Sequence, residues 1–592
     1  MRAAAIGIGL LALLAAACEG RPRPADTTET PKKFGPAVAV MDLSGGVPEQ
    51  EKAGLFGAQG TRKSFDEALR VATELAKDDD TRGVMVKLGS AAIGAARAME
   101  LGEVLAKIRA KKKVFCHADG LTNATMMLAA QGCSSIWISP AGEVAAIGIA
   151  AQLIYMRKLL VDELHLSIDM QQVGKYKGAE EPLTRDGPSP EAKASLMGVL
   201  TDMRAAWVET LVAAKPKVPA DAFEDGPWAA PKAKELGIID EVGYADDMLV
   251  ALRTASGAVR ERVVFGAGAE EDGDLDDVVR TLAGESGGAG PIALVRATGS
   301  IAMTSGGNGI LGGSGGIVEK DFSRTIARLE KDDDVKAVVV RIDSPGGSAL
   351  ASDLMWHRLM KLRKKKPLVF SVGDMAASGG YYLASSGDFV FAEAMSIVGS
   401  IGVVGGKIGG GDALERIGVH AETFAASTKE GAAARAAYES PLEKWDDPTK
   451  ARVLESMTGI YELFLARVSE GRSTRGRTVT REQVDANAEG KIFSGRDGKR
   501  LGLIDEIGGL GAAIARARQL AQLGESARVA VVTGKGGLLE SLDPSAAAEN
   551  AFSPIGILGR VAPDTVPFVS SLAPLAQGER TSACLPYALT VK

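Results

Sequence analysis

The sequence predicts an α/β protein in which one fold occurs twice in tandem, each copy having a β-sheet core with helices packed against it. Two observations lead to this prediction. Short apolar runs alternate with amphipathic stretches of helical period, a pattern typical of a sheet flanked by helices. The same order of segments recurs about 255 residues later, and a repeat of this length indicates two homologous domains.

Three pairs of segments carry the repeat. The pairs lie at residues 36–46 and 291–300, at 65–88 and 322–342, and at 236–243 and 501–508. The first pair is a short apolar strand that ends at glycine. In the second pair, an amphipathic helix ends at a shared Lys-Asp-Asp-Asp and leads into a β-branched strand. The third pair reads LGIIDEVG and LGLIDEIG. Because the three pairs occur in the same order, we interpret them as one duplicated domain.

The length of 592 residues also requires more than one domain. With 46% hydrophobic and 24% charged residues, the composition is that of a globular enzyme, not of a disordered chain or a polytopic membrane protein. The predicted division is a signal peptide at 1–17, a tether at 18–35, a first copy at 36–256, a linker at 257–290, a second copy at 291–525 and an extension at 526–592. Within the extension, Val529–Val532 is expected to form one more strand.

The N-terminus is expected to be an export signal. Arg2 is followed by an uncharged apolar run from Ala3 to Ala17, which is short for a membrane-spanning helix. Its LAAAC ending resembles a bacterial lipoprotein signal, in which Cys18 becomes the lipidated N-terminus. The alternatives are an ordinary cleaved signal and an uncleaved anchor. All three place the chain outside the cytoplasm, and we expect it on the periplasmic side of a bacterial cell envelope, anchored to a membrane.

Composition narrows the chemistry further. The net charge of −6, with both signs interspersed, gives no indication of a nucleic-acid partner. The four Cys residues contain no CxxC pair, so neither a disulfide scaffold nor a zinc ribbon is expected. The four His residues are scattered, which argues against a His-rich metal centre. A nucleophile in this chain is therefore expected to use a base other than His.

The second copy contains a turn suited to binding a developing negative charge. Residues 341–348 read RIDSPGGS, a strand that ends in two adjacent glycines. Glycines allow backbone N–H groups to approach a reacting carbonyl and stabilise its oxyanion. The corresponding first-copy segment begins at Lys87 and reads KLGSAAI, without Pro-Gly-Gly. The first copy has therefore lost this feature.

A candidate nucleophile follows in the second copy. Ser378 lies in GDMAASGGYYLA, between small residues and two glycines, just before an apolar helical pattern. This places its hydroxyl at a strand-to-helix turn, close to the N–H groups that begin the helix. Taken alone, such a serine is more often a plain helix cap. In the first copy, Asn123 occupies the aligned position and cannot act as this nucleophile.

The candidate base comes from the other copy. A buried lysine loses charge because desolvation lowers its pKa from about 10.4, which makes the amine a competent general base. Lys177, in YKGAEEP, aligns with Glu430 of the second copy. The complementary losses indicate that one copy retains the nucleophile and the other the base. Long-range contact of Ser378 with His420 or His357 stays open at this point.

These motifs resemble the long, two-domain form of the signal peptide peptidase A (SppA) family, Ser-Lys serine proteases of the Clp-protease/crotonase superfamily. The resemblance covers residues 36–525 and rests on DSPGGS, GDMAASGGYYLAS, GSIGVVGG and the first-copy YKGAEEP. It implies Ser378 as nucleophile, Lys177 as base and Ser400 as the residue that orients the lysine amine. It further implies an oxyanion hole from the N–H groups of Gly346, Gly347 and Gly379. Lys429 lies where single-domain relatives carry their base and is the second candidate.

The resemblance also implies a function. The expected reaction is hydrolysis of leftover signal peptides and other unfolded apolar peptides near the membrane, without metal, nucleotide or other cofactor, by a bowl-shaped homotetramer. Relatives of the long form often begin with a transmembrane anchor, whereas this chain is expected to use Cys18. Two alternatives are a crotonase-like acyl-CoA enzyme and a non-catalytic scaffold of the same fold. Export argues against the first, and the intact Ser378, Lys177 and Pro-Gly-Gly argue against the second.

Overall fold

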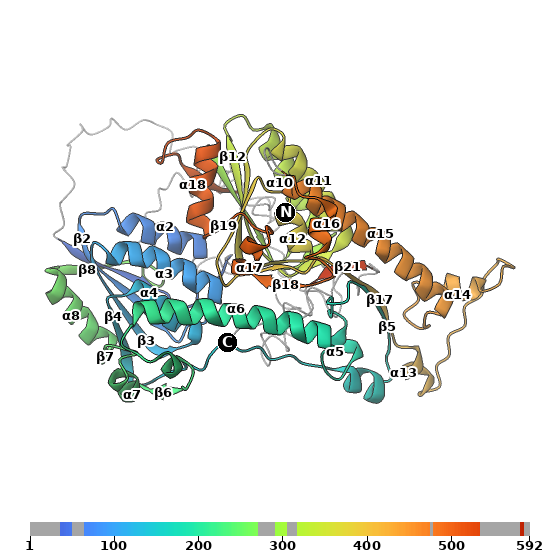
Figure 1. The fold of residues 1–592 in the computed structure, drawn as a ribbon, viewed down its shortest axis with the longest axis horizontal. Coiled ribbons are helices and arrows are strands. Elements are labelled where there is room, and N and C mark those ends of the chain that lie inside the picture. The colour runs from blue at the N-terminus through green and yellow to red at the C-terminus, as the bar shows by residue number, and fades with distance from the viewer. Residues whose placement is uncertain are drawn as a thin grey trace, which may run out of the picture.

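A computed structural model gives the fold of the protein (Figure 1). It describes residues 36–49, 64–269, 290–304, 316–473, 478–532 and 581–584. The expected signal peptide, the lipidation site Cys18 and the tether lie outside these residues. Within the described ranges, no helix is both long enough and apolar enough to cross a bilayer.

The first copy is built on a seven-stranded sheet in the order β6-β4-β3-β2-β1-β8, with β7 beside β4. The strands are β1 (Ala37–Asp42), β2 (Thr81–Gly89), β3 (Lys113–Leu121), β4 (Ser135–Val144), β6 (Trp228–Ala229), β7 (Glu241–Val242) and β8 (Arg260–Phe265). The α-helices of this copy are α2 (Phe65–Leu75), α3 (Ala95–Arg109), α4 (Asn123–Gly132), α5 (Glu181–Thr184), α6 (Pro190–Ala214), α7 (Ala230–Glu235) and α8 (Ala245–Ser256). All pairings between β1, β2, β3, β4 and β8 are parallel, so the connecting helices lie against the faces of the sheet.

The second copy repeats this plan. Its eight-stranded sheet has the order β18-β16-β14-β12-β9-β20, with β15 joining β14 to β19. The strands are β9 (Ile292–Thr298), β12 (Ala337–Ser344), β14 (Leu368–Ala377), β15 (Phe389–Ala392), β16 (Ile397–Gly399), β18 (Ile492–Ser494), β19 (Glu506–Ile507) and β20 (Val529–Val532). The helices are α10 (Glu319–Lys331), α11 (Ala349–Arg363), α12 (Gly379–Ala384), α15 (Asp447–Arg472), α16 (Arg481–Asp485), α17 (Gly495–Arg500) and α18 (Leu510–Leu520).

Residue patterns account for these elements. In α10 the buried residues Phe322, Ile326 and Leu329 follow the spacing of one helix face. Strand β12 is buried at all but one of its positions, as expected for a central parallel strand covered on both faces. The duplicated α/β fold expected from the sequence is present in both copies.

Two boundaries differ from the prediction. Strand β8 lies within the expected linker, yet it pairs in parallel with β1 and extends the first sheet. Strand β20 lies within the expected extension, and it pairs in parallel with β9 in the same way. Strand β20 is therefore the counterpart of β8. Each copy therefore ends with a strand beside its own first strand.

A third sheet combines residues from both copies and from the C-terminal end. Its strand order is β11-β10-β13-β21-β17-β5. The strands are β5 (Ser167–Val173), β10 (Ile301–Ala302), β11 (Ile317–Val318), β13 (Gly346–Ser348), β17 (Val403–Gly409) and β21 (Thr581–Cys584). First-copy β5 pairs antiparallel with second-copy β17 over its whole length, from Ser167 opposite Gly409 to Val173 opposite Val403. This pairing carries the chain that follows β5 into the second copy.

The two copies also share one apolar core. Its main cluster contains residues of α2 and α3 together with Val339, Val369 and Ala377 of the second sheet. Helix α6 contacts α4 in its own copy and β18 in the other, and it runs along both (Figure 1). At 25 residues it is about 37 Å long, enough to reach from one copy onto the other. The copies are therefore packed as one body.

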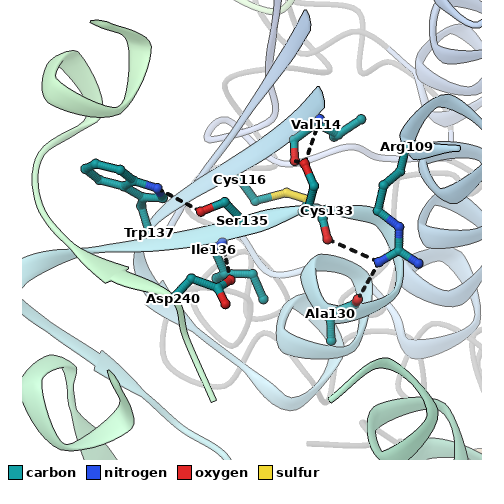
Figure 2. The surroundings of a disulfide bond; sticks show 10 residues. Arg109, Val114, Cys116, Ala130, Cys133, Ser135, Ile136, Trp137 and Asp240 are labelled. Carbon is teal, nitrogen blue, oxygen red and sulfur yellow. Dashed lines mark hydrogen bonds between the residues drawn. A yellow bond between two sulfur atoms is a disulfide. The ribbon is translucent and has the colours of Figure 1, made fainter. Parts of the chain in front are cut away.

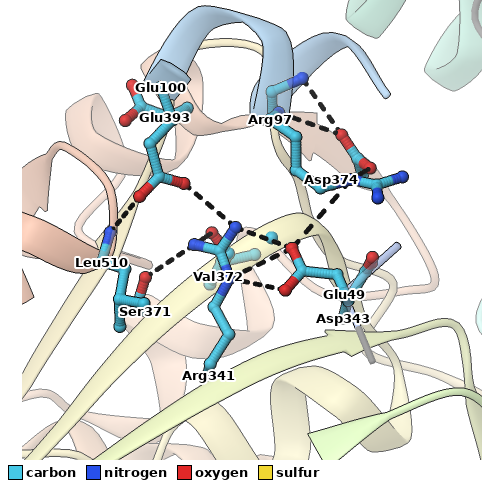
Figure 3. A network of polar contacts seen from close by, with 12 residues as sticks. Glu49, Arg97, Glu100, Arg341, Asp343, Ser371, Val372, Asp374, Glu393 and Leu510 are labelled. Carbon is cyan, nitrogen blue, oxygen red and sulfur yellow. Dashed lines mark hydrogen bonds and ion pairs between the residues drawn. The ribbon is translucent and has the colours of Figure 1, made fainter. Parts of the chain in front are cut away.

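Buried charges complete the contact between the copies (Figure 3). The Arg341 guanidinium lies 2.7 Å from Glu49 and 3.0 Å from Glu100, both from the first copy. The carboxylate of Asp374, in β14, accepts backbone N–H groups from the first turn of α3 and lies 2.6 Å from the Arg97 guanidinium. A helix N-terminus favours a carboxylate there. These contacts hold β14 against the first copy four residues before Ser378.

A disulfide joins two elements of the first copy (Figure 2). Cys116 in β3 is bonded to Cys133, the residue that follows α4. Arg109 donates to the carbonyl oxygens of Ala130 and Cys133 beside it. No spacing motif predicts this pair, because the two cysteines come together only when α4 folds back on β3.

Candidate active site

Three neighbouring strands of the second sheet end at the same place. Ser344 ends β12, Ala377 ends β14 and Gly399 ends β16, and these strands pair in parallel. The carboxyl ends of parallel strands share one edge of a sheet, where binding sites commonly form. The segments that follow these strands contain Pro345-Gly-Gly, Ser378 and Ser400. This edge is therefore where the predicted residues meet.

Ser378 lies at the expected strand-to-helix turn, between β14 and α12. Its φ of 55° is a left-handed value that a residue with a side chain seldom adopts, and such strain is concentrated at functional sites. Two backbone hydrogen bonds hold this conformation. The Ser378 N–H donates to Gly399, and its carbonyl accepts from Tyr382. The hydroxyl is fully buried.

Lys177 reaches this hydroxyl from the first copy. The residue follows β5 by four positions, and the β5–β17 pairing places it beside Ser400. Its Nζ lies 2.7 Å from the Ser378 Oγ, 2.8 Å from the Ser400 carbonyl oxygen and 2.9 Å from the Ser400 Oγ. Lys177, Ser378 and Ser400 are all fully buried. The structure thus brings together the three side chains that the sequence selected from two separate copies.

The backbone of Ser400 has the same left-handed φ as that of Ser378 and is likewise hydrogen-bonded. It also has a φ of 55°, and its N–H donates to the carbonyl of Lys491. In this conformation both its carbonyl and its hydroxyl face the Lys177 amine. Ser400 therefore fixes the position of the amine through two contacts, only one of which depends on its side chain.

Two glycines that the sequence analysis did not single out enclose Lys177. Gly490 has a φ of +84°, and a Cβ added there would lie 2.5 Å from the Lys177 Cα. A Cβ added at Gly402 would lie 3.1 Å from the Lys177 Cδ. Gly402 lies within the quoted GSIGVVGG and Gly490 within none of the quoted motifs, and no motif predicts this approach to Lys177. Gly490 follows Glu489, whose carbonyl accepts the N–H of Tyr176, so the loop before Lys177 rests directly on residues 489–490.

The candidate oxyanion donors lie around the same turn. Gly346 and Gly347 form part of β13, with φ values of 98° and 151°. The N–H of Gly346 donates to the Ser344 hydroxyl at 3.2 Å, so this donor already has a protein acceptor. Gly379 is the first residue of α12, and an N–H at that position has no acceptor within its helix. The Gly346 N–H is therefore already engaged, whereas the Gly379 N–H is open at the start of its helix.

The other candidate bases do not belong to this site. Lys429, His420 and His357 are exposed, whereas the Ser378 hydroxyl is fully buried. In the first copy, Thr122 precedes α4 and its hydroxyl is used in a capping box with Thr125. The neighbouring Asn123 amide bonds to the backbone at positions 147 and 148. The first copy therefore presents no free hydroxyl at this junction.

A titratable carboxyl lies three residues beyond Lys177. Burial raises the pKa of Glu180 to about 7, and the charge of Glu181 contributes to the rise, while Lys177 opposes it. Burial also raises the pKa of Asp343 to about 7, together with the charges of Asp374 and Glu49. Asp343 immediately precedes the Ser344 that ends β12. Both carboxyls change charge near neutral pH.

Comparison with known proteins gives matches along both copies. The family model described as Peptidase family S49 matches residues 106–258 and 360–524, together more than half of the chain. "Serine protease SPPA, chloroplastic" of Arabidopsis thaliana is 30% identical over 404 residues, covering 68% of this chain and 57% of that protein. "Protease 4" of Salmonella typhi is 29% identical over 508 residues, covering 82% and 78% of the two chains.

A third relative, "Protease 4" of Haemophilus influenzae, is 30% identical over 423 residues, covering 69% of this chain and 65% of that protein. The two segments matched by the family model fall one in each copy. This confirms the duplicated α/β fold and the resemblance on which the sequence prediction rested.

Proposed function

Because this chain belongs to peptidase family S49 and is a serine peptidase, we propose that it is a membrane-associated endopeptidase that degrades cleaved signal peptides and other unfolded apolar peptides. The observation that carries the proposal is the buried contact between Lys177 and Ser378. A lysine amine and a serine hydroxyl that are buried at hydrogen-bond distance form a nucleophile and its base.

The proposed reaction begins with the unprotonated amine. Burial disfavours the charged form of an amine, and Lys177 is fully buried. Its Nζ takes the Ser378 proton while the Oγ attacks the substrate carbonyl, and the N–H groups of Gly347 and Gly379 stabilise the oxyanion. Lys177 then returns the proton to the departing amine, which leaves an acyl ester on Ser378. Lys177 then takes a proton from water as that water attacks the ester, and returns it to the departing Ser378 Oγ, which releases the acid and restores the free enzyme.

The proposed location is the periplasmic side of a bacterial envelope, with Cys18 as a lipid anchor. The apolar run before Cys18 supports export. The Cys116–Cys133 disulfide supports it independently, because disulfides persist in oxidising compartments and are rare in the cytosol. Signal peptides are released at the same membrane, so an anchored peptidase would meet them where they form.

The proposed assembly is a homotetramer. Helices α13 (Gly411–Glu415) and α14 (Ala432–Ala436) project beyond the body of the second copy (Figure 1). The segment around them exposes 74% of Ile417 and 83% of Phe424. Exposed apolar side chains on a projecting segment support contact with another chain. Light scattering of the purified protein would give four chains per particle if this proposal holds.

One experiment tests the function. Wild type and Ser378→Ala are incubated with a mixture of synthetic signal peptides, polar peptides of equal length and a folded protein, and mass spectrometry identifies the cut sites. We expect wild type to cut signal peptides within their apolar segments and to leave the folded protein intact. Cleavage of the polar peptides alone would contradict the proposed substrate class. Binding of CoA, without cleavage, would support the acyl-CoA alternative.

A further inference from the structure

Strand β21 fills a gap between two strands that lead to the active site. It pairs antiparallel with β13, with Gly346, Gly347 and Ser348 opposite Cys584, Ala583 and Ser582. On its other side it pairs antiparallel with β17, where Val404 lies opposite Ser582 and Gly405 opposite Thr581. Figure 1 shows β21 beside β17. No other strand joins β13 to β17 among the described residues.

The two strands that flank β21 frame the dyad. Strand β13 contains Gly347, one of the two glycines proposed for the oxyanion hole, and β17 begins three residues after Ser400. Neighbouring strands lie about 4.8 Å apart, so the space between β13 and β17 accepts one extended chain. Such a chain completes backbone hydrogen bonds on both sides, whatever its side chains are. This is the geometry in which a protease holds an extended peptide.

The register places one residue of β21 at the dyad. Cys584 lies opposite Gly346, at the Pro-Gly-Gly end of β13. Continuing the β17 register by two residues brings Cys584 opposite Gly402, whose added Cβ would lie 3.1 Å from the Lys177 side chain. Both neighbours therefore place the same end of β21 next to the catalytic groups.

We propose that Thr581–Cys584 is an internal pseudosubstrate, which occupies the strand position of the peptide substrate and holds the enzyme in an autoinhibited state. A side-chain hydrogen bond adds to the backbone pairing of this segment. The Ser582 hydroxyl is fully buried and donates to the Gly347 carbonyl at 2.8 Å. Because the segment belongs to the same chain, it competes with substrate at a high effective concentration. Substrate enters only when β21 leaves the sheet.

The test compares the full chain with a chain that ends at Arg580. A competing internal strand reduces the fraction of enzyme able to bind substrate, and apparent affinity falls by that fraction. For a short peptide substrate, we expect truncation to lower KM by about tenfold or more and to leave kcat unchanged. Ala583→Pro in the full chain should act in the same direction, because proline removes a backbone donor from a central strand. Unchanged KM in both variants would overturn the proposal.

Three further measurements separate competition from a structural role. The synthetic peptide with the sequence of residues 581–592 should inhibit the truncated chain competitively, whereas a scrambled peptide should not. A lower Tm on truncation, with KM unchanged and no inhibition by the peptide, would show that β21 only completes the sheet. In a Ser378→Ala background, the fluorescein-labelled peptide should bind the truncated chain and not the full chain. This binding is read without catalysis, so it stands even if the substrate class proposed above is wrong.

Discussion

The amine of Lys177 lies 2.7 Å from the hydroxyl of Ser378, although 201 positions separate the two residues in the chain. Each comes from a different copy of the duplicated fold. The pairing of β5 with β17 carries the first-copy loop into the second copy, and the strained turn at Ser378 directs the hydroxyl toward it. One candidate catalytic centre is thereby assembled from two domains.

Lys177→Met should abolish peptide hydrolysis, with kcat falling about 10⁴-fold or more, because Ser378 loses the group that removes its proton. The matched control is Lys175→Met, which alters an exposed lysine of the same loop. Lys429→Met tests the second candidate base. We expect both controls to keep wild-type kcat, as measured with a fluorogenic peptide. A large loss in Lys429→Met alone would assign the base to that residue instead.

Ser400→Ala should lower kcat about 10- to 100-fold with KM unchanged, because misplacing a catalytic group slightly is costly. The effect is partial since the Ser400 carbonyl still accepts from the Lys177 amine at 2.8 Å. The pH at which kcat is half of its maximum should also shift, because Ser400 contacts the Lys177 amine. Loss of a purely structural contact would leave this pH unchanged. Ser396→Ala removes another buried serine hydroxyl, which bonds to Gly373 and not to Lys177, and serves as control. Equal kcat in the two variants would contradict a positioning role for Ser400.

Gly490→Ala should reduce kcat about 100-fold, because the new methyl group would displace Lys177. Gly502→Ala is a matched control. Gly502 has a φ of +76°, close to the +84° of Gly490, but a Cβ there meets nothing within 4 Å. Both variants should lose about 1–2 kcal/mol of stability from the left-handed backbone, and Gly490→Ala should lose more because its Cβ also meets the Lys177 backbone. Tm therefore falls in both variants and activity in only one. Matching losses of activity would show that backbone strain alone is responsible.

Reduction of the Cys116–Cys133 disulfide should destabilise the first copy by about 3 kcal/mol, since it closes a loop with a sequence separation of 17. Calorimetry with and without reductant should show a lower Tm for the reduced wild type. The double variant Cys116→Ser, Cys133→Ser should have this lower Tm in both conditions. An identical Tm for oxidised and reduced wild type would show that the bond contributes no stability.

Asp343→Asn should change how stability depends on pH. The folded-state pKa of Asp343 is raised to about 7 from 3.8 by burial and by the charges of Asp374 and Glu49. Between these values the folded chain retains a proton that the unfolded chain releases, so this group makes stability fall as pH rises from about 4 to about 7. Urea titrations across this range should show a smaller fall in Asp343→Asn than in wild type. Parallel curves would mean that Asp343 titrates normally.

The sequence was sufficient for the fold class and for the choice of Ser378, Lys177 and Ser400 as candidates. Strands and helices follow local periodicity, and duplication made the loss of function in one copy visible at Asn123. The approach of Gly490 to Lys177 could not be predicted in this way. A single glycine has many structural uses, and its contact here depends on how two distant loops fold together.

The position of Thr581–Cys584 was equally inaccessible to sequence analysis. Four small residues carry no periodic signal, and β21 is a strand only because β13 and β17 supply its partners. The extent of each copy was misjudged for a related reason. Strands β8 and β20 are recognised as parts of the copies by their pairing with β1 and β9, which lie far away in the sequence.

The central claim is that the Lys177 amine of the first copy activates the Ser378 hydroxyl of the second. Its most direct test is the rate at which a fluorophosphonate probe labels Ser378, measured across pH by mass spectrometry in wild type and in Lys177→Ala. We predict labelling of Ser378 in wild type at a rate that rises with pH as the amine loses its proton, and almost none in Lys177→Ala. Equal labelling rates in the two proteins would contradict the account.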